Sequence, residues 1–174
     1  MRKSLFIAFL VPVCLLTLVG LGGCSVSYGL NGASIDYTRV KTIHIVDFQN
    51  LAANVYPPLA QKLSEDLRDR FQRQTRLSHT NTMGDLNIEG EIVGYDLTAE
   101  AVQADAYAAK TKLTMRVNIR YDNRVDEKES FEREFTSFTT FDSSQMFTTV
   151  QDQLVEDLVK DLINQIFNAT VENW

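Results

Sequence analysis

Apolar and polar residues alternate over four segments of the chain, and each alternation predicts a β-strand. Residues 111–121 show the pattern most clearly, because every second position from Leu113 to Tyr121 is Leu, Met, Val, Ile or Tyr and the positions between them are polar. Residues 131–136 alternate in the same way after a turn and predict the return strand of a hairpin. Residues 86–97 predict a further strand with a bulge at Gly94. Residues 40–48 carry apolar side chains at both parities, which favours a central strand.

Two stretches depart from this alternation. Phe138 and Phe141 extend the return strand with a changed parity, and this predicts a second bulge. Residues 98–109 are rich in alanine and polar residues without a clean period. That composition is typical of a loop or of a loose hairpin arm.

Two other segments repeat their apolar residues every three or four positions, as amphipathic helices do. Pro57–Pro58 opens the first helix, since proline suits a first turn where its missing N–H is not needed. The apolar face of this helix consists of Leu59, Leu63, Leu67 and Phe71. Residues 147–169 carry an unbroken apolar stripe and predict the second helix. Each helix therefore has one face that must be buried.

The predicted order is strand, helix, three strands and helix. Two helices that bury one face each fit a sheet that is covered on one side only. We therefore expect an α/β fold, a two-layer sandwich with a mixed sheet of about four strands and both helices packed on one face. The other face of this sheet must meet water or a partner.

The start of the chain has the pattern of a bacterial secretory signal. Arg2 and Lys3 precede an apolar run over residues 5–18, and small residues follow it. Leu21-Gly22-Gly23-Cys24 then resembles the lipobox of bacterial lipoproteins. The resemblance implies cleavage before Cys24 and lipidation of its thiol.

Cleavage at this place divides the chain into three parts. We expect a signal peptide at residues 1–23, a lipidated tether at 24–39 and a single domain at 40–174. An uncleaved membrane anchor is the alternative, but Pro12 interrupts the apolar run, which is shorter than the roughly 20 residues of a spanning helix. Ser25 stands where an Asp retains many Gram-negative lipoproteins at the inner membrane. The outer membrane is therefore the expected location, with the protein lipid-anchored and its body facing the periplasm.

The charge balance of the chain is acidic. The formal net charge is −6, and the loss of the two basic residues Arg2 and Lys3 with the signal changes it to −8. Nonspecific nucleic-acid binding depends on basic charge, so we expect no nucleic acid as a partner. Cys14 also leaves with the signal, so no cysteine remains in the mature domain for a disulfide.

The sequence shows no recognisable catalytic or metal-binding set. His44 and His79 are the only histidines, one in the middle of a predicted strand and the other in a connection. For His44 a packed strand histidine is favoured over a catalytic base. No spacing of His, Cys and carboxylates fits zinc, and no glycine-rich phosphate loop or nucleophile elbow is present. We therefore expect no enzyme, no cofactor and no metal.

A concentration of positive charge lies on the polar side of the 111–121 strand. Four basic residues share this parity: Lys110, Lys112, Arg116 and Arg120. One interpretation is contact with phosphates or with an acidic wall of a partner, since Arg and Lys bind phosphate well. The other is cross-strand pairing with Glu132 and Glu134 of the return strand, which have the matching parity. Both interpretations hold if only one end of this row of basic residues is paired.

Several short segments of the chain follow one another in an order that is typical of a known family. They are Tyr28 to Gly32, Ile43 to Asn50, Pro57 to Ala60 with Leu67 and Phe71, Gly84 to Tyr95, and the ending Ile166 to Trp174. Together they resemble the LptE family of lipopolysaccharide-assembly lipoproteins. The resemblance covers nearly all of the mature chain, and its motifs are structural rather than catalytic.

The resemblance implies a role in which this family acts as a plug inside a large outer-membrane barrel, LptD. A wide barrel has a polar lumen that a second protein can fill. The implied partners are an LptD-type barrel, lipopolysaccharide and, through the N-terminal lipid, the membrane. Lys112, Arg116 and Arg120 then become candidates for lipopolysaccharide or barrel contact. The alternative is a periplasm-facing lipoprotein that activates an envelope enzyme or assists an ABC-type transporter.

Overall fold

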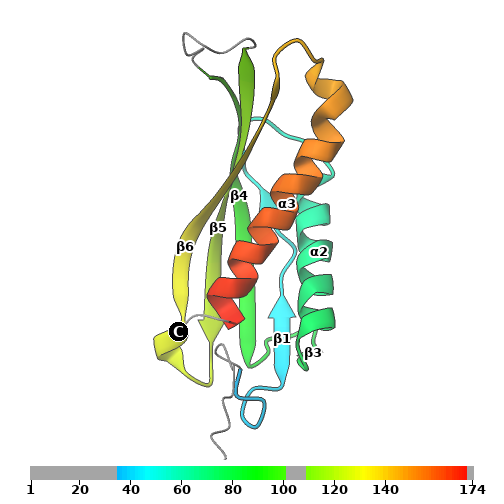
Figure 1. Cartoon of the computed structure of the whole chain (residues 1–174). Coiled ribbons are helices and arrows are strands. Elements are labelled where there is room, and N and C mark those ends of the chain that lie inside the picture. The colour runs from blue at the N-terminus through cyan, green and yellow to red at the C-terminus, as the bar shows by residue number, and fades with distance from the viewer. Residues whose placement is uncertain (1–34, 101–108, 172–174) are drawn as a thin grey trace, which may run out of the picture. The chain divides into compact units, whose positions relative to one another are not determined.

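A computed structural model describes residues 35–100 and 109–171, which form one mixed sheet and two α-helices (Figure 1). The strands are β1 (Thr42–Ile45), β2 (Gln49–Asn50), β3 (Ser78–His79), β4 (Leu86–Ala99), β5 (Lys110–Asn123) and β6 (Phe131–Asp142). The helices are α2 (Leu59–Gln74), α3 (Phe147–Val171) and the short 3-10 helix η1 (Glu127–Glu129).

Adjacent strands follow the order β3-β1-β4-β5-β6, and β2 pairs with β4 beside β1. β1 runs parallel to both β3 and β4, whereas β5 runs antiparallel to its two neighbours, β4 and β6. The expected two-layer α/β sandwich is therefore confirmed. The described sheet has six strands instead of about four because β2 and β3 are additional two-residue pieces.

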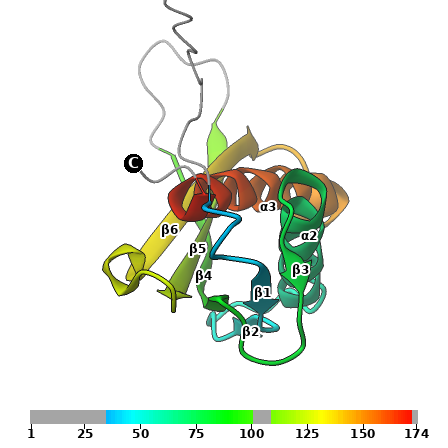
Figure 2. The ribbon, with the colours of Figure 1, turned by 90° about the horizontal axis from the view of Figure 1, so that it is seen from below.

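Both helices lie on the same side of the sheet, as the end-on view shows (Figure 2). The predicted apolar face of α2 is the buried one, since Leu59, Leu63, Leu67 and Phe71 are all 0% exposed. α3 buries its stripe between Leu154 and Ile166 in the same core. The two helices meet where the rings of Phe71 and Phe167 lie 5.0 Å apart. The helices thus cover the apolar face of the sheet, and the opposite face is left uncovered by them.

The strand predicted over residues 40–48 is shorter than expected. β1 ends at Ile45, although the N–H of Val46 still donates to Ile88 O of β4 at 3.0 Å, and the strand ladder resumes at β2. Side chains of α2 bind two backbone groups at this break. The Phe48 N–H donates to Ser64 Oγ at 2.9 Å, and Arg68 Nη2 donates to Ile45 O at 3.0 Å. The helix replaces the ladder bonds there, so the strand breaks without leaving these groups unpaired.

One of the two predicted bulges is present and the other is not. The β4–β5 register shifts between Ile92 and Gly94, which confirms the first. The β5–β6 register runs from Lys110 opposite Asp142 to Tyr121 opposite Phe131 without a shift, so the second prediction was wrong. Phe138 is 63% exposed and simply stands on the open face, where the Lys112 ammonium lies 5.0 Å from its ring centre.

Gly90 leaves room for the ring of Phe48 on the core face of β4. A Cβ at residue 90 would lie 1.9 Å and 2.4 Å from two ring carbons of Phe48, and 2.9 Å from Cδ1 of Ile119. Both neighbours are buried, so neither can move into solvent. We expect Gly90→Ala to lower the free energy of unfolding by about 1–3 kcal/mol, as overpacked cores do. Urea denaturation measures this change.

Glu91→Ala is the matched control for this substitution. Glu91 neighbours Gly90 on the same strand but is exposed, so its loss should change stability by less than about 0.5 kcal/mol. Equal stability of the two variants would show that Phe48 and Ile119 repack freely, contrary to this prediction.

Candidate functional site

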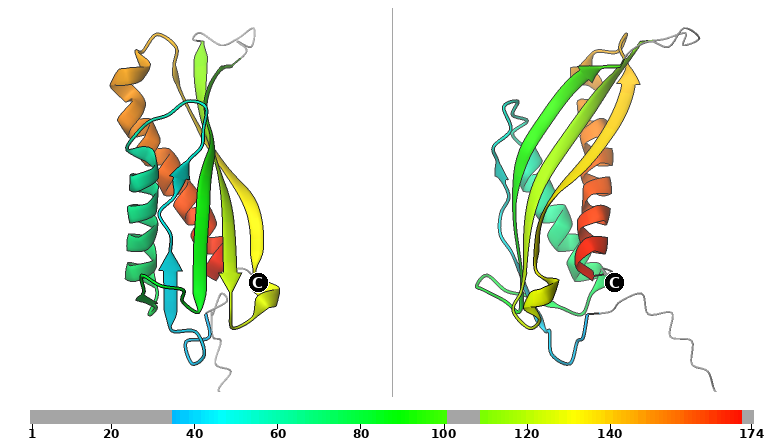
Figure 3. Two further views of the ribbon diagram at one scale, coloured as in Figure 1. Left: turned by 180° about the vertical axis from the view of Figure 1, so that it is seen from behind. Right: turned by 90° about the vertical axis from the view of Figure 1, so that its left-hand side faces the viewer.

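The sheet face that the helices leave open carries a basic row between two acidic rows. The basic row on β5 consists of Lys112, Arg116 and Arg120. Acidic residues of the same face stand on β4 and β6, namely Glu89, Glu91, Asp96, Glu132 and Glu134. The three long strands that carry these rows run side by side with a strong twist (Figure 3). Opposite charges on neighbouring strands are thus brought within pairing reach.

Two of the three candidate cations form ion pairs, and both use carboxylates from the β4 side. Lys112 Nζ lies 3.4 Å from Glu100 Oε1, and Arg116 Nη2 lies 3.4 Å from Asp96 Oδ2. The four side chains are between one third and one half exposed, so each pair contributes little to stability. Lys112 and Arg116 therefore do form ion pairs, but with carboxylates on the β4 side and not with the expected Glu132 and Glu134 of β6.

Arg120 differs from the other two cations. The register places it between Glu89 on β4 and Glu132 on β6, and its side chain is exposed. Within residues 35–100 and 109–171 it takes part in none of the ion pairs closer than 4.0 Å. Glu132 instead accepts a hydrogen bond from Asn118 Nδ2 at 3.3 Å. Arg120 is thus the candidate cation whose guanidinium is most available to an added ligand.

Gly94 belongs to this site although the sequence marked it only as a bulge. It stands opposite Arg116, and a Cβ at residue 94 would lie 2.6 Å from Nε and 2.8 Å from Nη2 of that arginine. The guanidinium therefore lies over the bulge in the space that a larger residue would occupy. The sequence shows a glycine in one predicted strand and an arginine in the next. That these two residues face each other follows only from the β4–β5 register.

A hollow of about 400 Å³ opens beside Arg120 toward the β1 edge of the same face. His44, Asn87, Glu89 and Asp122 contribute polar groups to it. The Nδ1 of His44 lies 2.8 Å from the carbonyl oxygen of Thr80, so this nitrogen donates to the backbone. That bond ties β1 to the segment after β3 and supports the interpretation of His44 as a packed strand histidine.

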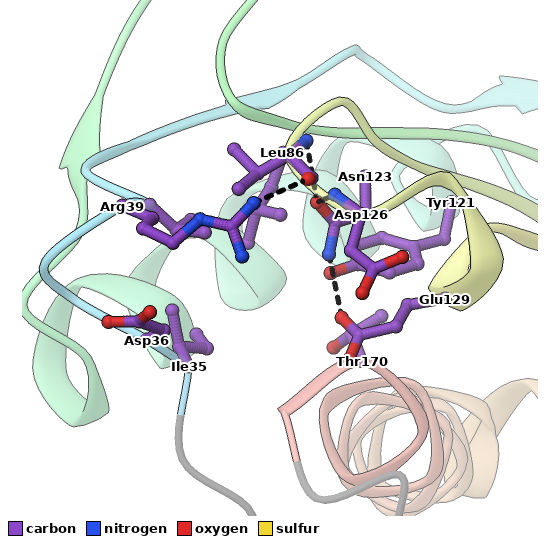
Figure 4. A pocket seen from close by; sticks show the side chains of 11 residues that line it. Ile35, Asp36, Arg39, Leu86, Tyr121, Asn123, Asp126, Glu129 and Thr170 are labelled. Carbon is purple, nitrogen blue, oxygen red and sulfur yellow. Dashed lines mark hydrogen bonds between the residues drawn. The ribbon is translucent and has the colours of Figure 1, made fainter.

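A smaller pocket of about 100 Å³ lies where the segment before β1 meets the β5–β6 turn (Figure 4). Its polar groups are bonded to one another: Arg39 Nη2 donates to Val125 O at 3.0 Å, and Asn123 Nδ2 donates to Glu129 Oε2 at 2.7 Å. Burial raises the pKa of Tyr121, which keeps its hydroxyl neutral. These groups hold the turn together and do not form a nucleophile with an adjacent base.

The described residues contain neither a metal-binding cluster nor a membrane-spanning helix. No group of three or more His, Cys, Asp or Glu among them could hold a metal ion. None of the helices in residues 35–100 and 109–171 is long and apolar enough to cross a membrane. Cys24, the residue expected to carry lipid, lies outside the described residues, as does most of the expected tether.

The fold and the open face together define a class of protein, a two-layer α/β sandwich that presents a charged sheet face beside a helix-covered core. Comparison with family models then assigns the chain within that class. The model of the LptE family, described as lipopolysaccharide-assembly, matches residues 40–170, and the chain belongs to this family. It is therefore a lipopolysaccharide-assembly protein of the cell envelope.

Solved structures similar to this chain are distant in sequence. A minor lipoprotein from Acinetobacter baumannii is 13% identical with a TM-score of 0.48, covering 73% of this chain and 89% of that chain. A hypothetical protein from Chlamydia trachomatis is 8% identical with a TM-score of 0.49, covering 75% and 98%. Lipoprotein B from Nitrosomonas europaea is 20% identical with a TM-score of 0.47, covering 73% and 79%. Comparison with curated proteins finds no match. The family assignment rests on the match over residues 40–170.

Proposed function

We propose that this protein is an outer-membrane lipoprotein that acts as plug and assembly partner of an LptD-type β-barrel in lipopolysaccharide transport. The observation that carries the proposal is the family match over residues 40–170, which spans the folded domain from before β1 to the last turn of α3. The open sheet face supports it, because a domain inside a wide barrel meets a polar lumen rather than lipid. The rows of charged residues on that face are compatible with contact to the polar wall of such a lumen.

The lipid on Cys24 is the membrane contact in this proposal. The described chain begins at Ile35, which is buried against the core together with Val40. The intervening residues reach at most roughly 40 Å when fully extended. A lipid at Cys24 would therefore keep the domain close to the inner surface of the outer membrane, where the periplasmic mouth of a barrel lies.

Depletion in the native bacterium, followed by purification of the tagged protein from its outer membrane, tests the proposed function. We expect the barrel to be misassembled without this protein and to co-purify with it when present. A pull-down dominated by peptidoglycan synthases or by inner-membrane transport proteins would instead favour a periplasm-facing activator of an envelope enzyme or ABC-type transporter. Purification without any large barrel would overturn the plug role.

Within this function we propose Lys112, Arg116 and Arg120 as contacts for lipopolysaccharide phosphates or for an acidic barrel wall. Reversing two of these charges, Arg116→Glu with Arg120→Glu, should weaken binding of lipopolysaccharide or of the barrel about tenfold or more. Charge-assisted hydrogen bonds contribute about 1.5–3 kcal/mol each, which corresponds to that factor. Binding titrations with purified lipopolysaccharide, and recovery of the barrel, measure the two contacts separately.

The control is the double reversal Lys128→Glu with Lys160→Glu, which changes net charge equally. Both lysines are exposed and lie on η1 and α3, away from the open face. Thermal unfolding should show that both variants fold, since an exposed ion pair such as Arg116–Asp96 stabilises by only about 0–1 kcal/mol. Equal binding by the two double variants would mean that the basic row only forms cross-strand ion pairs and contacts neither ligand.

A further inference from the structure

Among the described residues, the outer edge of β6 leaves the backbone N–H and C=O groups of Phe138 and Thr140 without a hydrogen-bond partner. In an antiparallel pair, successive residues point their N–H and C=O alternately toward and away from the neighbour. Ser143 N, just beyond β6, donates to Ala109 O at 3.0 Å, so odd residues face β5. The Thr136 carbonyl points the other way and accepts from Gln165 Nε2 of α3 at 3.1 Å. Since the register has no shift, Phe138 and Thr140 also direct their N–H and C=O outward.

This edge lacks the features by which proteins protect sheet edges. Natural edge strands are short, or carry charges, prolines or bulges that block further pairing. β3, at the opposite end of the sheet, has only two residues. β6 has 12 residues and no bulge, and its four charged residues lie near its two ends, Glu132, Arg133 and Glu134 at the start and Asp142 at the end. The remainder, residues 135–141, contains only Phe, Thr and Ser, which favour β structure.

Phe138 adds an apolar contact at the same place. Its side chain is 63% exposed, although most large apolar side chains of the described sheet are buried. It stands on the last strand of the described sheet, with the Lys112 ammonium on one side and none of the described strands on the other. A strand added to β6 would cover this ring, because side chains at adjacent positions of neighbouring strands lie in contact.

Charge argues against a second copy of this chain as the added strand. In an antiparallel pairing of two β6 strands centred on Phe138, Glu134 of one copy would stand opposite Asp142 of the other. Like charges in such positions are destabilising. The net charge of −6 on each chain adds to the repulsion. The edge instead suits a segment with a basic or uncharged residue opposite Glu134.

We propose that β6 adds an extended segment of the barrel partner as a further strand along Phe138 to Thr140, with the ring of Phe138 covered by that segment. The segment donates to and accepts from the outward backbone groups of Phe138 and Thr140, as in other cases of strand addition. This inference rests on the proposed function, since it names the way in which the barrel is bound. It adds a backbone contact at the sheet edge to the side-chain contacts proposed for the charged face.

Thr140→Pro tests the edge without disturbing the hairpin. Proline removes the outward N–H at this residue, and no bond to β5 is lost because even residues face away from it. Thr140→Ser is the matched control, since it keeps the N–H. We expect Thr140→Pro to lower recovery of the barrel with the tagged full chain about tenfold, while Thr140→Ser recovers it as the unchanged protein does.

Amide hydrogen exchange on the unchanged protein provides a second readout that needs no variant. The outward amides of Phe138 and Thr140 should exchange rapidly in the free protein and slow at least about tenfold in the purified complex with the barrel. Full barrel recovery with Thr140→Pro, or exchange of these amides unchanged in the complex, overturns the edge proposal while the plug role stands. Failure of the unchanged protein to recover any barrel overturns both. A dimer of the free protein that Thr140→Pro makes monomeric assigns the edge to a second copy and also overturns the proposal.

Discussion

Cys24→Ser should move this protein almost completely from the membrane fraction to the soluble fraction. Each buried methylene of an acyl chain contributes about 0.8 kcal/mol, so one chain alone binds marginally while several hold a protein firmly. A serine cannot carry the thioether-linked lipid that the lipobox implies at this position. Fractionation of cells, followed by sedimentation of membranes, measures the change. We expect lipopolysaccharide transport to fall with it, because the domain would no longer be held near the barrel.

Two further variants make this experiment specific. Cys14→Ser changes the other cysteine, which is expected to leave with the signal peptide, and should leave location unchanged. Ser25→Asp keeps the lipid but introduces the residue that retains many Gram-negative lipoproteins, so the protein should shift to the inner membrane. If the Cys24→Ser protein stayed in the membrane at full length, residues 1–23 would be an uncleaved anchor.

Phe71→Ala should produce the largest loss of stability among single substitutions in α2. The Phe71 side chain is 0% exposed and its ring packs 5.0 Å from that of Phe167. It is therefore a principal contact between the two helices on the sheet. Removing a buried phenylalanine costs about 3–5 kcal/mol through lost burial and the cavity left behind. That is a large part of the 5–15 kcal/mol typical of a domain, and urea denaturation measures it directly.

Phe138→Ala is the matched control, because it removes the same group from a side chain that is 63% exposed. Its effect on the free protein should stay within about 0.5 kcal/mol. A loss below about 1 kcal/mol for Phe71→Ala would mean that α2 and α3 repack around the missing ring. The helix–helix contact would then depend on the neighbouring leucines instead.

The helices and the long hairpin were predictable because each has a single buried face with an unbroken period. Leu59, Leu63 and Leu67 recur at the spacing of one helix face, and they are the residues that α2 buries. The alternation in β5 likewise places Leu113 and Met115 in the core. These patterns depend only on neighbours along the chain. The first strand was predicted too long because its end is set by Ser64 and Arg68, side chains of the next helix.

The candidate site was only partly predictable. Shared parity placed Lys112, Arg116 and Arg120 on one face, and in the structure they lie on one open face. Their acidic partners on the β4 side were not predicted, because shared parity shows that a charge faces outward but not which neighbouring strand supplies its partner. Beyond the bulge Tyr95 is buried and Asp96 reaches Arg116. Parity along one strand contains no information about a register shift in its neighbour.

The sequence by itself determined the fold class, the two helix faces, the bulge at Gly94 and the shared face of the basic residues, and it predicts lipidation at Cys24. Only the tertiary structure decided that β1 ends at Ile45, that the cations pair with carboxylates on the β4 side, and that β6 has an open edge. The physical reason is that periodicity records which side chains are buried, a property of local geometry. Which backbone groups and charges remain unpaired depends on strand order and register, which join residues far apart in the chain.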